Sequence, residues 1–130
     1  MLNDIKMKKI FYLLLLPVLL AGCTSITNLT PSQYPRDPSG FYRVEAEWKS
    51  SRQAIQPDSF QPLVMIGFDT FPMRPVSVVQ DRWEALIPVP ADKDFVLYRY
   101  KFDYVVNAIS KPHPDSLMSA EYTLKIGEKK

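Results

Sequence analysis

The chain has 130 residues, enough for one small domain, and its 16 basic and 14 acidic side chains give it a formal net charge of +2. It has no polybasic run that could follow a phosphate backbone, so the composition argues against nucleic-acid binding. A single histidine and a single cysteine are too few for a zinc site and exclude an intramolecular disulfide.

Residues 1–22 have the three parts of an export signal. A basic region that includes Lys8 precedes an apolar run over residues 10–20, and the small residue Gly22 lies directly before Cys23. The 11 residues of the apolar run would span only about 16 Å as a helix, half the thickness of a hydrocarbon core. We therefore expect a cleaved signal helix and not a helix that spans the membrane.

The sequence Leu20-Ala21-Gly22-Cys23 resembles the lipobox of bacterial lipoproteins, in which a leucine and two small residues precede the cysteine that is lipidated. The resemblance covers residues 7–24 and implies cleavage between Gly22 and Cys23, with a membrane anchor of two or more acyl chains on Cys23. Thr24 is not the aspartate that retains such proteins in the inner membrane. The resemblance therefore also implies an outer-membrane location, on the periplasmic or the surface face, if the host is Gram-negative.

Cleavage would change the charge of the chain. Removing three lysines and one aspartate would leave 13 basic and 13 acidic side chains, and lipidation of Cys23 would leave no thiol. Residues 1–6 are expected to precede the true start, because a typical signal opens at Met7. Residues 23–40, rich in Thr, Ser and Pro, are predicted to be the lipidated cysteine and a flexible tether. A folded domain is predicted over residues 41–126, followed by a charged tail over residues 127–130.

From residue 41 onwards, apolar residues recur with the period of two that is typical of strands. Prolines predict a turn or an edge crossing over residues 69–75 and a loop over residues 107–117. Residues 63–68 are predicted to be buried on both faces. The strands are predicted over residues 41–48, 63–68, 76–79, 83–87, 95–106 and 120–126. We expect an all-β fold, a small antiparallel immunoglobulin-like β-sandwich of six or seven strands, with a small barrel as the alternative.

The strand over residues 95–106 has an unbroken apolar face that includes Tyr98 and Tyr100. We interpret this face as part of the core, because each sheet of a sandwich must bury one face. The alternative is an exposed aromatic platform on which sugars stack. In that case Trp48 or Trp83 should lie exposed and coplanar with a tyrosine.

A second resemblance involves residues 82–103. A strand that contains Trp83 ends at Pro88 and Pro90 and leads into a strand with the sequence Tyr100-Lys101-Phe102. This arrangement resembles early-set immunoglobulin-like modules, some of which bind glycogen or starch. The chain lacks the glycine usual before the second strand and the Asp-Gly turn usual after it. The resemblance implies the sandwich fold, leaves carbohydrate binding as an alternative and identifies no site residues.

Candidate catalytic and metal-binding groups are few. His113, Asp115 and Ser116 are neighbours in a proline-rich segment and cannot converge as a triad. Asp92 and Asp94 are interpreted as a solvated hairpin turn and not as part of a calcium site. An enzyme would need a pocket lined by carboxylates with perturbed pKa values, for which the candidates are Asp69, Asp81 and Asp103. We expect no enzyme activity, no cofactor and no metal.

The predicted function is that of a membrane-anchored, non-enzymatic binding or assembly module for another protein of the cell envelope. Two proline-stiffened loops are the candidate binding surfaces, because a stiff loop loses little entropy when it binds. One loop carries Phe68, Phe71 and Met73, and the other carries His113. The alternative is a lipid-anchored carbohydrate-binding module.

Overall fold

Strands make up most of the structure, a computed structural model that describes residues 24–51, 54–107 and 109–127. The predicted signal sequence and Cys23 lie outside the described residues. In chain order the elements are β1 (Thr24–Asn28), β2 (Gln33–Tyr34), β3 (Phe41–Ser50), the 3-10 turn η1 (Pro57–Ser59), β4 (Gln61–Ile66), β5 (Asp69–Pro72), β6 (Arg74–Pro75), β7 (Arg82–Pro88), β8 (Phe95–Asn107), β9 (Pro112–Met118) and β10 (Tyr122–Ile126).

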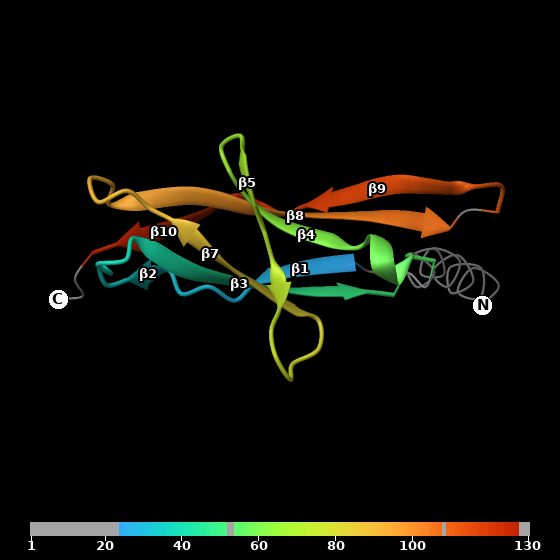
Figure 1. Cartoon of the computed structure of the whole chain (residues 1–130), viewed down its shortest axis with the longest axis horizontal. Coiled ribbons are helices and arrows are strands. Elements are labelled where there is room, and N and C mark those ends of the chain that lie inside the picture. Colours follow the sequence, from blue (N-terminus) through green and yellow to red (C-terminus); the bar gives the residue numbers. More distant parts are fainter. Residues whose placement is uncertain (1–23, 52–53, 108, 128–130) are drawn as a thin grey trace, which may run out of the picture.

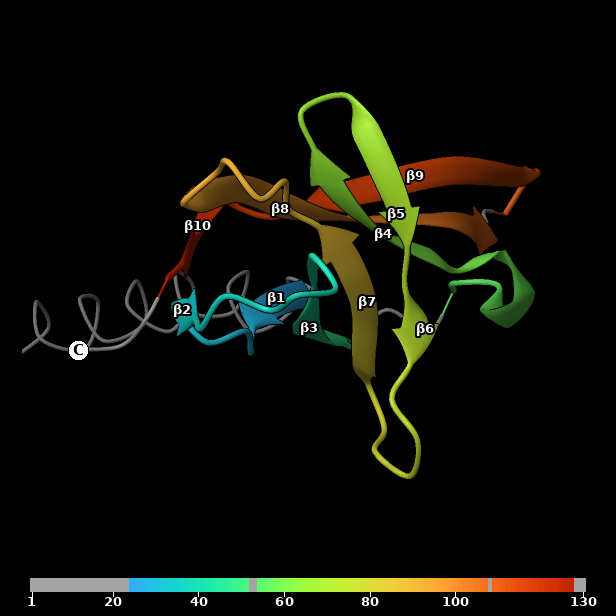
Figure 2. The same ribbon diagram turned by 60° about the vertical axis from the view of Figure 1, so that its left-hand side comes forward.

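The strands form two layers of an elongated sandwich (Figure 1, Figure 2). One sheet has the strand order β1-β3-β7-β6, and the other has the order β2-β10-β8-β4-β5, with β9 also paired to β8. The predicted all-β sandwich is confirmed. The described residues hold more strands than the six or seven predicted, and β2 runs parallel to β10, so the second sheet is mixed.

The core lies between the sheets and is largely aromatic. Tyr98, Tyr100 and Phe102 alternate along β8 and are at most 2% exposed, as the period of a half-buried strand requires. They face β3, where the ring of Trp48 lies 4.7 Å from the ring of Phe102, centroid to centroid. The interpretation of this face of β8 as core is confirmed.

The prediction of a flexible tether is wrong for residues 24–34. β1 pairs with β3 along its whole length, and β2 pairs with β10. The buried hydroxyl groups of Tyr98 and Tyr100 explain why this polar segment packs against the sandwich. Asn28 Nδ2 donates to the Tyr98 hydroxyl at 2.9 Å, and the Tyr100 hydroxyl donates to Asn28 Oδ1 at 2.7 Å. The polar side chains that suggest a tether in the sequence thus provide hydrogen-bond partners for polar groups of the core.

The prediction of a loop over residues 107–117 is also wrong, because most of this segment forms β9. β9 pairs with β8 from Asn107↔Pro112 to Lys101↔Met118 and has no other partner strand among the described residues. An edge strand tolerates proline wherever the missing N–H would have pointed away from the ladder. His113 therefore lies on a strand and not in a proline-stiffened loop.

The chain crosses from one sheet to the other at Met73, between the edge strands β5 and β6. The predicted edge crossing is thereby confirmed. The predicted strand over residues 76–79 is wrong, because this segment forms the turn into β7 and Val78 has a φ of 67°. β4 is central, but Val64 is buried whereas Leu63 is only half-buried, so burial on both faces was also a wrong prediction.

Candidate functional site

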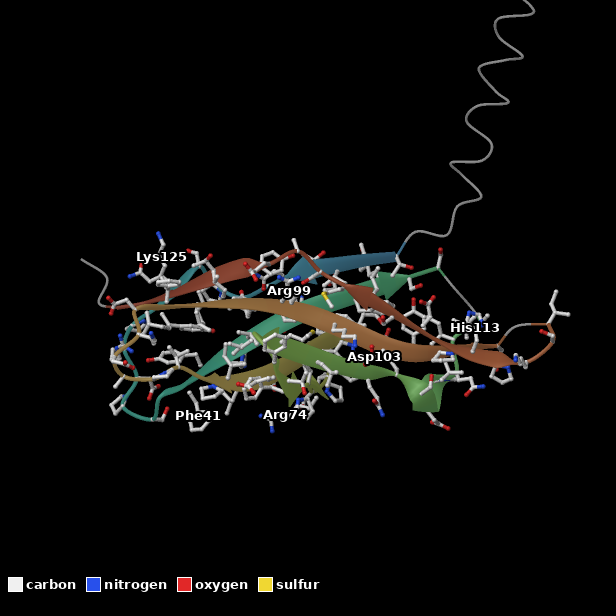
Figure 3. The ribbon with its side chains drawn as sticks, turned by 90° about the horizontal axis from the view of Figure 1, so that it is seen from above. Phe41, Arg74, Arg99, Asp103, His113 and Lys125 are labelled. Atoms are coloured by element: carbon white, nitrogen blue, oxygen red, sulfur yellow. The ribbon has the colours of Figure 1, made fainter. Side chains whose placement is uncertain are left out.

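An apolar groove of about 830 Å³ lies at one end of the sandwich. Its walls come from the turn before β3, the turn between β7 and β8, the start of β8 and the β4–β5 hairpin. The apolar side chains that define it are Phe41, Ile66, Phe71, Phe95, Val96 and Leu97. Figure 3 shows Phe41 toward this end of the molecule and His113 toward the other.

The groove exists because β8 is longer than its neighbour β4. β4 pairs with β8 only from Arg99 to Asp103, whereas residues 95–98 pair with β10 on the opposite edge of β8. Beyond this point the β4–β5 hairpin projects away from the sheet (Figure 2). Residues 95–97 therefore have a backbone edge with which no described strand pairs.

The groove exposes apolar side chains that a closed core would bury. Phe41, Phe95 and Leu97 are 50%, 54% and 43% exposed. Val89 also lines the groove and is only 2% exposed, so it forms the floor. Large apolar side chains gathered in one concave surface are typical of a binding site.

A tight turn before β3 holds Phe41 at the groove. The Gly40 N–H donates to the Asp37 carbonyl oxygen at 3.1 Å, and the Val89 N–H donates to the Gly40 carbonyl oxygen at 2.9 Å. Gly40 has a φ of 76°, which favours glycine. The Ser39 N–H donates to Asp37 Oδ1 at 2.8 Å, and this backbone hydrogen bond lowers the pKa of Asp37. The turn therefore carries a carboxylate that stays ionised throughout the neutral range.

The structure brings together only part of the predicted binding site. Phe71 lines the groove, and Phe68 lies beside it on the β4–β5 turn with its side chain fully exposed. Met73 is only 7% exposed, because the crossing between the sheets places it in the core. It cannot serve as a docking residue, contrary to the prediction. His113 is exposed on β9, toward the end opposite the groove (Figure 3).

Phe41, Phe95 and Leu97 are groove residues that the sequence analysis missed. A signal for them was present. Phe41 and Leu97 are apolar residues on the outward faces of β3 and β8. Two residues further along, the same face carries a charged side chain, Arg43 on β3 and Arg99 on β8. Apolar residues on the polar face of a strand mark a surface that needs an explanation.

The two tryptophans line a second cavity, of about 620 Å³, at the end of the sandwich opposite the groove. Trp48 is buried, and the half-buried Trp83 packs against Phe60 with ring centroids 5.2 Å apart and an interplanar angle of 49°. Neither tryptophan forms an exposed, coplanar pair with a tyrosine among the described ring contacts. The carbohydrate alternative depended on such a pair.

The carboxylates considered for an enzyme lie in three separate places. Asp69 lines the groove, Asp81 lines the second cavity, and Asp103 lies on β8. Within residues 24–51, 54–107 and 109–127, no three His, Cys, Asp or Glu side chains gather as potential metal ligands.

Residues 7–24 match the family model of the prokaryotic membrane lipoprotein lipid attachment site, which confirms the predicted lipobox. The chain is thus a membrane lipoprotein, anchored by lipid in the bacterial envelope. A comparison with curated proteins found no match. Among solved structures, that of murine CRIg is similar, with 10% sequence identity, a TM-score of 0.40 and coverage of 82% of this chain and 99% of that one. The described part of the chain has no helix long and apolar enough to cross a membrane.

Proposed function

We propose that this lipoprotein is a non-enzymatic binding or assembly module, and that its groove takes an extended apolar segment of another cell-envelope protein. The observation that carries the proposal is the presence, at one site, of exposed apolar side chains and an uncovered strand edge. These are the two features that strand addition uses. The backbone edge supplies hydrogen bonds, and the pockets beside it select side chains.

The strand edge indicates how the segment would bind. Residues 95–97 of β8 have β10 on one side and no described partner strand on the other. A segment laid along the uncovered edge would extend the sheet, and its side chains would alternate between the two faces. Side chains on the inner face would cover Ile66 and Val96, and those on the outer face would cover Phe95 and Leu97.

Burial of the exposed apolar surface would supply the driving force. Phe41 and Phe95 are each about half exposed. Covering each of them would contribute about half of the roughly 1.5–3 kcal/mol expected for a whole side chain. Asp69 and Lys93 are the charged residues among those that line the groove, so little charge has to be desolvated. This composition favours an apolar protein segment over a polar sugar.

The outer membrane of a Gram-negative host is the proposed location of the anchor. The support is Thr24, which stands where inner-membrane lipoproteins of such hosts have a retaining aspartate. Separation of the two membranes on a density gradient tests this proposal, with Thr24→Asp as the matched variant. The wild-type protein should sediment with the outer membrane and the variant with the inner one. Recovery of the wild-type protein in the inner membrane would contradict it.

Crosslinking in intact membranes, followed by purification of the lipoprotein, tests the groove. Leu97→Glu changes the groove, and Leu86→Glu changes a similarly exposed leucine on the outer face of β7. We expect the wild-type protein and Leu86→Glu to recover the same envelope protein. Leu97→Glu should recover about tenfold less, the effect of losing roughly 1.4 kcal/mol of binding free energy.

Equal recovery by the two variants, or recovery of the lipoprotein alone in every case, would contradict the proposal. Urea unfolding of both variants serves as the control, because a groove residue that is half exposed should be replaceable without unfolding the domain. The two midpoints should lie close together.

A further inference from the structure

The chain enters the fold without a linker after the lipid attachment site. Thr24 follows Cys23 directly in the sequence and is already paired with Ser50 at the start of β1. The hydroxyl oxygens of Thr24 and Ser50 lie 3.0 Å apart. Because one residue of chain spans at most about 3.6 Å, the anchor joins the domain at the end of the sandwich where β1 begins and β3 ends.

The turn between β8 and β9 belongs to the same end. The N–H of Asn107, the last residue of β8, donates to the Ala54 carbonyl oxygen at 2.7 Å, and Gln56 Nε2 donates to Asn107 Oδ1 at 2.6 Å. Ile55, between these two partners, lines the second cavity together with Ser50. These contacts join the end of β3 to the end of β8, and Figure 1 shows both strand ends on one side of the molecule.

This end carries an apolar side chain that the fold does not bury. Ile109, in the turn between β8 and β9, is fully exposed. Lys111, just before β9, and Lys49, near the end of β3, are exposed cations. Carboxylates also lie at this end: Glu47 on β3 lies 3.6 Å from the Lys49 ammonium group, and Asp81 lines the second cavity. Asp58 on η1 and Asp115 on β9 are on neighbouring elements. An exposed apolar side chain near lysines suits the boundary between lipid headgroups and acyl chains, where the lysines meet anionic headgroups.

We propose that this end of the sandwich, defined by Ser50, Ile55 and Ile109, lies on the bilayer, with Ile109 at the headgroup–acyl boundary. The groove lies at the other end. β3 runs from Phe41 at the groove to Ser50 at the anchor, and its 10 residues span about 30 Å. The groove consequently faces away from the membrane, whatever it binds.

Fluorescence quenching in vesicles tests this orientation. The full lipidated protein is reconstituted in vesicles of phosphatidylethanolamine and phosphatidylglycerol that contain nitroxide-labelled lipids. An environment-sensitive fluorophore is attached to Ile109→Cys, while Cys23 is blocked by its own lipid. The matched control carries the same fluorophore on Phe68→Cys, another fully exposed apolar residue, on the β4–β5 turn. Circular dichroism checks that both labelled proteins are folded.

We expect the nitroxides to quench the fluorophore at position 109 several times more strongly than the one at position 68. Equal quenching at the two positions, or stronger quenching at position 68, would overturn the proposal.

A second arm tests the direct attachment. A Gly-Ser linker of about 12 residues between Cys23 and Thr24 adds roughly 19 Å of mean reach. It should lower the quenching at position 109 to the level at position 68. Unchanged quenching at position 109 would overturn the claim that the short attachment fixes the orientation.

Discussion

Tyr100 shows how this core accommodates a polar group. Its side chain is fully buried, and its hydroxyl oxygen lies 2.7 Å from Asn28 Oδ1, 2.9 Å from Thr30 Oγ1 and 3.0 Å from the Glu45 carbonyl oxygen. Burial raises the pKa of Tyr100, because a phenolate inside the sandwich would lose its hydration. The residues just after the lipid attachment site thus take part in the polar chemistry of the core.

The free energy of unfolding should therefore fall at alkaline pH. The unfolded chain loses the Tyr100 proton above the ordinary pKa of 10.0, whereas the folded protein keeps it, so unfolding releases a proton and becomes more favourable as the pH rises. Urea unfolding should show a fall of up to about 1.4 kcal/mol for each pH unit above about pH 10. In Tyr100→Phe the fall should be smaller, and Tyr34, whose pKa burial also raises, should account for part of the remainder. An identical pH dependence in the variant would contradict this role of Tyr100.

At the scale of the elements, the sequence predicts the strands that bury one face and misses the strands that lie at an edge. β3, β7 and β8 alternate apolar and polar residues because one face of each meets the core. β1 and β9 are both rich in polar residues, and β9 also contains prolines. Their stability comes from pairing with a long neighbouring strand. No local pattern shows that such a neighbour is available.

The candidate site was predictable only in part for a related reason. Phe68, Phe71 and Met73 give the same signal in the sequence, since each is apolar and close to a turn. The crossing between the sheets buries Met73 and leaves Phe71 at the groove. The groove itself depends on β8 extending past β4, which is a property of strand register and not of any one segment.

β1 should behave as part of the sheet and not as a tether. The amide hydrogens of β1 that face β3 should exchange about as slowly as those of β3 itself, because both lie in one hydrogen-bonded ladder. Hydrogen–deuterium exchange on the full lipidated protein in detergent measures this, with residues 91 and 92, in the exposed turn between β7 and β8, as the fast-exchanging comparison. Exchange of the whole of β1 at the rate of residues 91 and 92 would show that the pairing with β3 does not persist in solution.

At the scale of the whole molecule, the two ends of the sandwich have different surfaces. One end combines the attachment to the lipid anchor with exposed Ile109, and the other holds the groove with its uncovered strand edge. β8 has 13 residues and spans about 40 Å, which separates the two surfaces. Because β1 is part of the sheet, the chain between the anchor and the domain is too short to let the domain turn over on the membrane.

Photo-crosslinking from one residue at each end, in intact cells, tests this arrangement most directly. A photoreactive amino acid replaces Leu97 at the groove in one protein and Ile109 at the anchor end in another. Leu97 should give an adduct with an envelope protein, and Ile109 should give an adduct with lipid. A lipid adduct from Leu97, or the same protein adduct from both positions, would contradict the assignment of the two ends.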